Sequence, residues 1–379
     1  MGQQMRIGVM TGGGDCPGLN AVLRAVVKTA VNDFDMSVIG FKDGYEGMVL
    51  GNYISLGKNA VSGILTYGGT ILGTSNRANP FNFPIPQKDT FVYLDRSSEL
   101  VANYEKLGLD AVIAIGGDGT MSAAAQLSGI GVNIVGVPKT IDNDLYGTDQ
   151  TFGFDSALTT AVDALDKIHS TAQSHHRVMI VEVMGRYAGW LALASGLAGG
   201  GDIILIPEIP YDIEAICDKI KERNRSGKNF SIIVVGEGAK SEGGEMVVAR
   251  MVENSPDAVR LGGISHRLAA EIENRTRLET RVTILGHLLR GGSPTAYDRL
   301  LATHFGCASV RQVAQKQFGQ LIVLKGTKIT SIPLVDVAGK TRLVPMDSYL
   351  ITSALSIGVS LGVTEEKLME MMTPAAVGQ

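Results

Sequence analysis

Three short polar segments hold residue types that can bind and transfer phosphate groups, and each directly follows a run of apolar residues. Residues 11–20 read TGGGDCPGLN, residues 115–120 read IGGDGT, and residues 138–149 read PKTIDNDLYGTD. The first segment lacks the third glycine of a dinucleotide fingerprint and the Lys-Ser/Thr ending of a P-loop. It is a glycine-rich turn whose amides either hold an anion at a helix N-terminus or only make a tight turn.

The second segment has a carboxylate, Asp118, between two glycines. An acidic side chain in a phosphate-binding turn would repel the phosphate unless a divalent cation lies between them. We therefore interpret Asp118 as a magnesium ligand for a nucleotide. The alternative is an aspartate that caps a helix, which is a common role for this residue. The flanking Gly117 and Gly119 favour the metal.

The third segment places Lys139, Asp142 and Asp144 within six residues. One carboxylate can take a proton from a hydroxyl while another helps to hold a metal, and a lysine can stabilise charge on a transferred phosphoryl group. The alternative is a polar turn built on Asp and Asn side chains. The two turns upstream favour catalysis.

Five cationic side chains form a fourth group, at or just past the ends of predicted strands: Arg177, Arg186, Arg281, His287 and Arg290. A guanidinium in such a place can grip a phosphate with two hydrogen bonds. A single arginine is better explained by a solubilising role at the surface, but the repeated placement favours an anion site. Glu237, after another predicted strand, either accepts hydrogen bonds from a sugar or caps a helix.

Apolar runs predict nine buried strands, at residues 6–10, 37–41, 111–115, 133–137, 178–183, 202–206, 230–235, 281–285 and 320–324. Apolar residues also recur with a helical period over residues 19–30 and 154–168. Buried strands that alternate with amphipathic helices predict an α/β fold with mainly parallel sheets covered on both faces. Ligands of such folds bind at the carboxyl ends of the strands, where the glycine-rich segments fall.

Length and charge limit the class of protein. A chain of 379 residues favours two compact lobes, and its net charge of −4 gives no general attraction to nucleic acid or to an anionic membrane. Uncharged stretches such as residues 187–201 and 348–364 fall short of a membrane span. The three cysteines form no CxxC pair, and we see no targeting pattern, so we expect a soluble, cytoplasmic protein.

Together these segments resemble the phosphofructokinase family, whose members phosphorylate the C1 hydroxyl of fructose 6-phosphate. The resemblance rests on GGDGT, TIDND, SHHR, VEVMGRYAG and LGHLLRGGSP in this order, and it runs from Arg6 to about Gly306. It implies Mg²⁺ as cofactor and the phosphofructokinase fold of two Rossmann-like lobes. Residues 1–152 with about 289–339 would bind the phosphoryl donor, and residues 153–288 with about 340–379 would bind fructose 6-phosphate.

The resemblance also implies a role for each matched residue. Catalysis would depend on Asp142 as general base together with Thr140, Arg186, Lys139, Gly13 and Gly14. ATP would contact Gly13, Gly14, Arg77, Ala78, Gly117, Asp118, Gly119 and Thr120, with Asp118 linked to the metal. The sugar phosphate would contact Thr140, Asp142, Met184, Gly185, Arg186, Glu237, His287 and Arg290. Arg177 and Arg281 would reach it from a neighbouring subunit, which implies a homodimer or a homotetramer.

Two residues give opposite indications about the donor. Gly119 resembles the ATP users of the family, because a small residue there leaves room for the α-phosphate and adenosine, whereas pyrophosphate users usually carry Asp. Lys139 resembles the pyrophosphate users. We predict ATP, because steric exclusion of adenosine is the more direct filter, and keep a pyrophosphate-dependent enzyme as the alternative.

Two other classes share part of this pattern. NAD and lipid kinases carry GGDGT, but TIDND followed by MGR and GHLLR separates them from this chain. A sugar-phosphate sensor on a kinase scaffold would have lost the base or the magnesium ligand, and Asp118, Asp142 and Arg186 are all present. The chain also continues past the family's usual end, through residues 329–362, and we expect packing or subunit contact from that tail.

Overall fold

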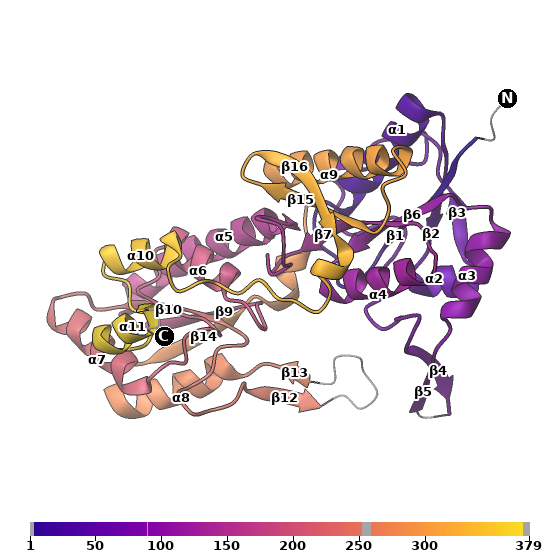
Figure 1. The fold of residues 1–379 in the computed structure, drawn as a ribbon. Coiled ribbons are helices and arrows are strands. Elements are labelled where there is room, and N and C mark those ends of the chain that lie inside the picture. The colour runs from indigo at the N-terminus through magenta and orange to yellow at the C-terminus, as the bar shows by residue number, and fades with distance from the viewer. Residues whose placement is uncertain (1–3, 89, 252–258, 374–379) are drawn as a thin grey trace, which may run out of the picture. The chain divides into compact units, whose positions relative to one another are not determined.

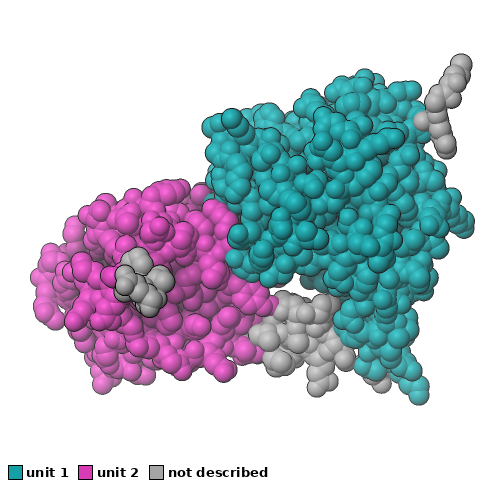
Figure 2. Space-filling model, viewed as in Figure 1, with its two compact units in different colours: residues 1–156, 253–256, 290–341 teal, residues 157–252, 257–289, 342–379 magenta. Residues whose placement is uncertain are grey.

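The computed structural model describes residues 4–88, 90–251 and 259–373. The chain divides into two compact units, coloured separately in Figure 2. Unit 1 comprises residues 1–156, 253–256 and 290–341, and unit 2 comprises residues 157–252, 257–289 and 342–379. The chain passes from unit 1 to unit 2 in the first turn of a long helix, α5 (Phe154–His175). The roles expected for the two lobes stay predictions.

Unit 1 is built on one large sheet with the strand order β16-β15-β7-β6-β1-β2-β3, and β8 pairs with β7 (Figure 1). The strands are β1 (Arg6–Thr11), β2 (Ser37–Phe41), β3 (Tyr53–Ser55), β6 (Ala111–Gly116), β7 (Ile134–Thr140), β8 (Phe152–Gly153), β15 (Gln320–Lys325) and β16 (Lys328–Pro333). The pairings are parallel except β2 with β3 and β15 with β16. A separate hairpin joins β4 (Phe83–Gln87) to β5 (Thr90–Leu94).

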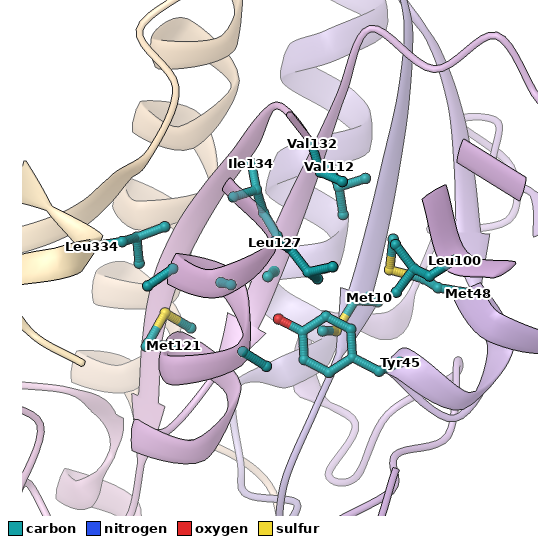
Figure 3. Close-up of a cluster of buried hydrophobic side chains, with 14 of the residues drawn as sticks. Met10, Tyr45, Met48, Leu100, Val112, Met121, Leu127, Val132, Ile134 and Leu334 are labelled. Atoms are coloured by element: carbon teal, nitrogen blue, oxygen red, sulfur yellow. The ribbon is translucent and has the colours of Figure 1, made fainter. Parts of the chain in front are cut away.

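Helices cover both faces of this sheet (Figure 1). One face carries α1 (Leu19–Phe34) and α9 (Ala296–Ala314), which pack on each other, and the other carries α2 (Tyr45–Leu50), α3 (Ser97–Lys106) and α4 (Asp118–Gly129). The core beneath α2–α4 joins helix side chains such as Tyr45 and Met121 to strand side chains such as Met10 and Val112 (Figure 3). Burial on both faces explains why β6 is apolar throughout.

Unit 2 has a smaller sheet of four parallel strands in the order β10-β11-β9-β14. These are β9 (Val178–Val183), β10 (Ile203–Leu205), β11 (Ser231–Gly236) and β14 (Thr280–Ile284). One face packs on α7 (Ile213–Arg225) and α8 (Ile264–Thr276), and α6 (Trp190–Ala198) packs on β10 and β11. A two-stranded hairpin, β12 (Val248–Met251) with β13 (Val259–Leu261), completes the strands of the described residues.

The predicted α/β fold with mainly parallel sheets is confirmed, and each of the nine predicted strands corresponds to an observed one. The sequence analysis did not predict β3, the two hairpins or β16, which occupies the first part of the tail and pairs antiparallel with β15. The rest of the tail folds as α10 (Tyr349–Ser356) and α11 (Glu365–Met372) in unit 2. Within the described residues, no helix has the length and apolar character needed to cross a membrane.

Candidate active site

Three neighbouring strands of unit 1 end in the three polar segments. β1, β6 and β7 are parallel, with Thr11 opposite Ile115 and Gly116 opposite Pro138. Because the carboxyl ends of parallel strands meet at one edge of a sheet, the glycine turn, Asp118 and Asp142 follow strands that end side by side. This edge carries the candidate donor residues.

The glycine turn after β1 has no room for side chains. Gly13 has a φ of +76°, a backbone conformation that favours glycine. A Cβ on Gly12 would lie 2.8 Å from Thr120 Oγ1, and a Cβ on Gly14 would lie 2.5 Å from Arg290 Nη1. The turn therefore requires glycine where its backbone meets the neighbouring turn and the arginine.

Side chains from three other segments hold the carbonyl groups of this turn. Thr74 Oγ1 donates to the Gly13 carbonyl at 2.6 Å, Lys139 Nζ donates to that of Gly14, and Arg290 Nη1 donates to that of Asp15 at 3.1 Å. Lys139 is only 3% exposed, and burial lowers the pKa of its ammonium group. The lysine that resembles pyrophosphate users is thus engaged with the protein backbone here.

Asp118 is the first residue of α4, while Gly117 occupies the capping position. The capping alternative for Asp118 is therefore wrong. Its carboxylate accepts hydrogen bonds from Ser122 Oγ at 3.4 Å and from the Gly339 amide at 3.3 Å. Burial raises the pKa of this carboxyl, since desolvation disfavours the charged form.

Of the other residues predicted to bind the donor, two are exposed to solvent and two are buried. Gly119 is exposed, and no atom lies within 4 Å of the place where its Cβ would be. Arg77 is also exposed. Thr120 is buried against Gly116, and the side chain of Ala78 belongs to the hydrophobic core, so only the backbone of Ala78 is available to a ligand.

The segment after β7 is shaped by local hydrogen bonds. The Asp142 amide donates to Thr140 Oγ1 at 3.1 Å, and Asn143 has a φ of +52°. Asn143 Oδ1 accepts from the Thr151 amide at 3.0 Å, and Thr151 Oγ1 donates to the Thr140 carbonyl at 2.8 Å. These contacts fix the backbone around Asp142, which lies two residues beyond the end of β7.

Asp144 is the residue whose significance the sequence analysis left open. Burial, and then the negative charge of Asp142, raise the pKa of its carboxyl from 3.8 to about 7. Asp118 contributes in the same direction, so the three carboxylates influence one another. Strongly shifted carboxyls at a strand edge are typical of functional sites. In the sequence, the only indication of a role for Asp144 was its place as the second aspartate of TIDND.

The carboxylates of Asp118 and Asp144 fit magnesium better than a metal that is held by three or more protein side chains. Among the residues that the structure describes, no three His, Cys, Asp or Glu side chains are grouped to hold a metal ion. Mg²⁺ usually takes one or two carboxylates and completes its shell with water and substrate phosphates. Asp118 and Asp144 provide that number of oxygen ligands.

Unit 2 also has three neighbouring parallel strands whose carboxyl ends are followed by predicted site residues. β11, β9 and β14 are parallel neighbours, with Gly236 opposite Val183 and Ile284 opposite Glu182. The predicted sugar-phosphate residues follow the carboxyl ends of these strands and are Met184, Gly185, Arg186, Glu237 and His287. This edge carries the candidate acceptor residues.

The turn after β9 is packed closely against the turn after β11. Gly185 has a φ of +136°, and the Gly238 amide donates to its carbonyl at 3.1 Å. A Cβ on Gly238 would lie 1.8 Å from the Arg186 carbonyl oxygen, so glycine is required there as well. Arg186, Tyr187 and Lys240 line a cavity of about 330 Å³ in this unit.

Two of the predicted arginines lie at the other edge of the sheet of unit 2. Arg177 precedes β9 and Arg281 lies near the start of β14, opposite Met179. Each stands at the amino-terminal end of its strand, whereas Arg186 follows the carboxyl end of β9. β9 alone separates the two edges by about 16 Å, so within one chain Arg177 and Arg281 form a surface separate from Arg186.

These two arginines share one carboxylate. Arg177 Nε donates to Glu279 Oε2 at 2.8 Å, and Arg281 pairs with the other oxygen of Glu279. Arg281 also lies 3.7 Å from Glu273. The hydrogen bond from Arg177 lowers the pKa of the Glu279 carboxyl. The arrangement brings two guanidinium groups together at an exposed anion.

The last predicted residue, Arg290, belongs to unit 1, in agreement with the expected lobe boundary at about residue 289. Its guanidinium lies against Gly14 and Asp15, as described above. Arg290 therefore contacts the glycine turn, and its expected contact with the sugar phosphate stays a prediction.

Comparison with known proteins identifies relatives over almost the whole chain. The family model described as phosphofructokinase matches residues 6–313. An ATP-dependent 6-phosphofructokinase 2 of Clostridium perfringens is 50% identical over 357 residues, which cover 94% of this chain and 98% of that protein. An ATP-dependent 6-phosphofructokinase 3 of Bacteroides thetaiotaomicron is 48% identical and is covered completely, against 94% of this chain.

Solved structures agree with these sequence matches. Phosphofructokinase from Saccharomyces cerevisiae aligns with a TM-score of 0.74 and 31% identity, over 97% of this chain and 50% of that one. A pyrophosphate-dependent phosphofructokinase from Marinobacter aquaeolei aligns with a TM-score of 0.77 at 20% identity, over 98% of this chain and 92% of that one, which shows a shared fold. The chain belongs to the phosphofructokinase family.

Proposed function

We propose that this protein is an ATP-dependent 6-phosphofructokinase of glycolysis. It transfers the γ-phosphoryl group of ATP to the C1 hydroxyl of fructose 6-phosphate and yields fructose 1,6-bisphosphate and ADP. The observation that carries the proposal is the convergence of the glycine turn, Asp118 and Asp142 at adjacent strand ends of one sheet. The names of the relatives at 50% and 48% identity support the reaction and the donor.

The choice of ATP is supported by Gly119. No protein atom lies within 4 Å of the place where a Cβ on Gly119 would be, which agrees with the room that the resemblance assigns there to the donor. Lys139, the residue that favoured pyrophosphate, is buried and donates to Gly14. A lysine in this position is compatible with ATP, because its charge holds the glycine turn rather than marking an open phosphate pocket.

Asp142 is the proposed general base. It takes the proton of the C1 hydroxyl as the oxygen attacks the γ-phosphorus, and the bond to the bridging oxygen of ADP breaks. In phosphoryl transfer the protein itself forms no covalent bond to the substrates. The rate depends on how the donor and acceptor are positioned and on neutralisation of the charge on the transferred phosphoryl group. Thr140 and the amides of Gly13 and Gly14 would contact the transferred group, and Arg186 and Arg77 would offset the charge on its oxygens.

Asp118 and Asp144 are the proposed residues that hold Mg²⁺ with the ATP phosphates. The ion supplies charge neutralisation on the donor phosphates when it is bound. Both carboxyls have raised pKa values, so each must lose a proton to act as a ligand.

The acceptor would be bound by the residues that follow the strands of unit 2, and the resemblance adds Arg290. Glu237 would accept hydrogen bonds from sugar hydroxyls, and the cationic side chains of Arg186, His287 and Arg290 would contact the phosphate or the reacting end. Arg177 and Arg281 would serve the acceptor of a neighbouring subunit in a homodimer or homotetramer. Their place at the opposite edge of the sheet from Arg186 supports this division.

A reducing compartment such as the cytoplasm fits the free thiols of Cys16, Cys217 and Cys307. The first experiment is to incubate the purified protein with ATP, Mg²⁺ and fructose 6-phosphate and to identify the products by mass spectrometry. We expect fructose 1,6-bisphosphate and ADP in equal amounts, and their loss on chelation of the metal. No bisphosphate product with either ATP or pyrophosphate would overturn the proposed function.

A further inference from the structure

The part of the C-terminal tail from Arg342 onward belongs to unit 2. Ser360 extends the sheet beside β10: the Ile204 amide donates to the Ser360 carbonyl at 2.9 Å, and the Ser360 amide donates to the Asp202 carbonyl at 3.0 Å. The Asp212 amide donates to the Gly362 carbonyl at 2.7 Å, and α10 packs on α6. The tail thus covers β10, the edge strand of the sheet, and its helix α10 packs on α6.

The start of this tail is bound through one glutamate. Both carboxylate oxygens of Glu208 accept from the Gly189 amide, at 3.0 and 3.1 Å, and Oε1 also accepts from the Val344 amide at 2.8 Å. Gly189 is the residue that caps α6, and it has no side chain of its own to do so. Glu208 therefore joins the beginning of α6 to the tail.

The same region carries the one tryptophan of the chain, Trp190. Its Nε1 donates to the Arg342 carbonyl at 2.8 Å, and the guanidinium carbon of Arg342 lies 4.0 Å from the centre of its ring. Trp190 is 7% exposed and Val344 is 2% exposed, so these contacts are shielded from water. We call Gly189, Trp190, Glu208, Arg342 and Val344 the tail clamp.

The tail clamp fixes one end of the turn that connects β9 to α6. This turn contains Met184, Gly185 and Arg186, and Gly189 lies only three residues beyond Arg186. The other end is fixed by the turn after β11, where the Glu237 amide donates to the Val183 carbonyl at 2.9 Å. A short connection held at both ends has few conformations, which positions its side chains before a ligand arrives.

We propose that the tail clamp positions the turn of Met184, Gly185 and Arg186, so that the tail sets the affinity for the acceptor sugar phosphate. This inference rests on the proposed function. It assigns Glu208 and Arg342 as positioning residues that act through Gly189 and Trp190, and it gives the tail a function beyond packing.

The first test uses the emission of Trp190 as a direct reporter of the clamp. Calorimetry first establishes whether the wild-type protein binds fructose 6-phosphate, which tests the proposed function separately. Because the clamp positions the turn before a ligand arrives, we expect the tryptophan emission to stay nearly unchanged when fructose 6-phosphate or ATP binds. A large shift of the emission on binding of fructose 6-phosphate would contradict the inference.

The second test compares Glu208→Gln with Glu366→Gln, a matched substitution at an exposed glutamate of α11. Glu208→Gln replaces one of the two acceptor oxygens by an NH₂ group, and because both oxygens accept from the Gly189 amide, a donor then faces that donor. We expect KM for fructose 6-phosphate to rise about ten-fold and KM for ATP to stay within about two-fold. Glu366→Gln should match the wild type.

Arg342→Ala is the second variant, since it removes the guanidinium from the ring and keeps the backbone carbonyl that Trp190 uses. We expect a smaller rise in KM for fructose 6-phosphate, in the same direction, and a changed emission spectrum. Loss of stability alone would lower the amount of active enzyme without changing KM. An unchanged KM for fructose 6-phosphate in folded Glu208→Gln and Arg342→Ala proteins would overturn the inference.

Discussion

At the scale of single residues, Asp142 and Asp144 stand two positions apart and have different surroundings. The backbone of Asp142 is tied to Thr140 at the end of β7. Asp144 has a carboxyl whose pKa is raised to about 7 by burial and by Asp142. We propose that the first acts on the acceptor hydroxyl and that the second acts with the metal.

Asp142→Asn tests the proposed base, because the amide keeps the shape of the side chain and cannot take a proton. We expect kcat to fall by about 10²- to 10⁴-fold, as for the loss of a general base, while fructose 6-phosphate binding stays measurable by calorimetry. Asp33→Asn, at an exposed aspartate of α1, is the matched control. Near-normal turnover in Asp142→Asn would end this assignment.

Asp144 predicts a pH dependence of the magnesium requirement. Because its pKa is raised from 3.8 to about 7, a proton competes with Mg²⁺ below neutral pH. The Mg²⁺ concentration for half-maximal activity should therefore rise as pH falls from about 8 to about 6. Asp144→Asn should need more Mg²⁺ at the upper end of this range and show a weaker dependence on pH. The same pH dependence in both proteins would contradict a metal-binding role for Asp144.

At the scale of elements, Asp298 links α9 to the first turn of α5. Its Oδ2 accepts from the Ser156 amide at 2.8 Å and from Ser156 Oγ at 2.6 Å, which caps the first turn of α5. β8 immediately precedes that turn and pairs with Lys139 and Thr140 of β7. The buried carboxylate therefore supports the strand end that carries the proposed catalytic segment.

Asp298 predicts a pH-dependent part of the stability. Burial raises the pKa of its carboxyl from 3.8 to about 6, so the folded protein binds this proton more tightly than the unfolded chain does. Stability from this group is complete below about pH 4 and is lost as pH rises through about 6. Relative to Asp298→Asn, the wild type should lose on the order of 2–3 kcal/mol across that window.

Differential scanning fluorimetry between about pH 4 and about pH 7.5 measures this difference in Tm. Asp163→Asn, at an exposed aspartate of α5, is the control and should keep a constant difference from the wild type. A difference in Tm between the wild type and Asp298→Asn that is the same at every pH would show that the pKa of Asp298 is not raised.

The elements also show how far the sequence predicts the site. Continuous apolar runs predicted the buried parallel strands. The polar segments that follow these runs predicted which residues lie at the carboxyl ends of the strands in each unit, because strand ends and glycine turns can be recognised from a few neighbouring residues. Arg177 and Arg281 were expected at strand ends, and the structure adds that both adjoin the beginning of a strand. The link from Trp190 to Arg342 spans 152 positions, and no local pattern predicts such a contact.

At the scale of the whole molecule, the proposed sharing of the site between subunits predicts complementation. A chain with Asp142→Asn keeps its Arg281, and a chain with Arg281→Ala keeps its Asp142, so a mixed oligomer has some sites in which both are intact. Co-expression of the two inactive variants should restore about a quarter of the sites in randomly mixed dimers. Activity of the mixture equal to the sum of the separate variants would contradict a shared site.

The central claim is that this phosphofructokinase uses ATP. It is tested most directly by a coupled assay of the wild-type protein with fructose 6-phosphate and Mg²⁺, in which ATP and pyrophosphate are compared as donors under the same conditions. Since Gly119 leaves its surroundings open and Lys139 is engaged with Gly14, we predict that kcat/KM for ATP greatly exceeds that for pyrophosphate. A higher kcat/KM for pyrophosphate would contradict the claim.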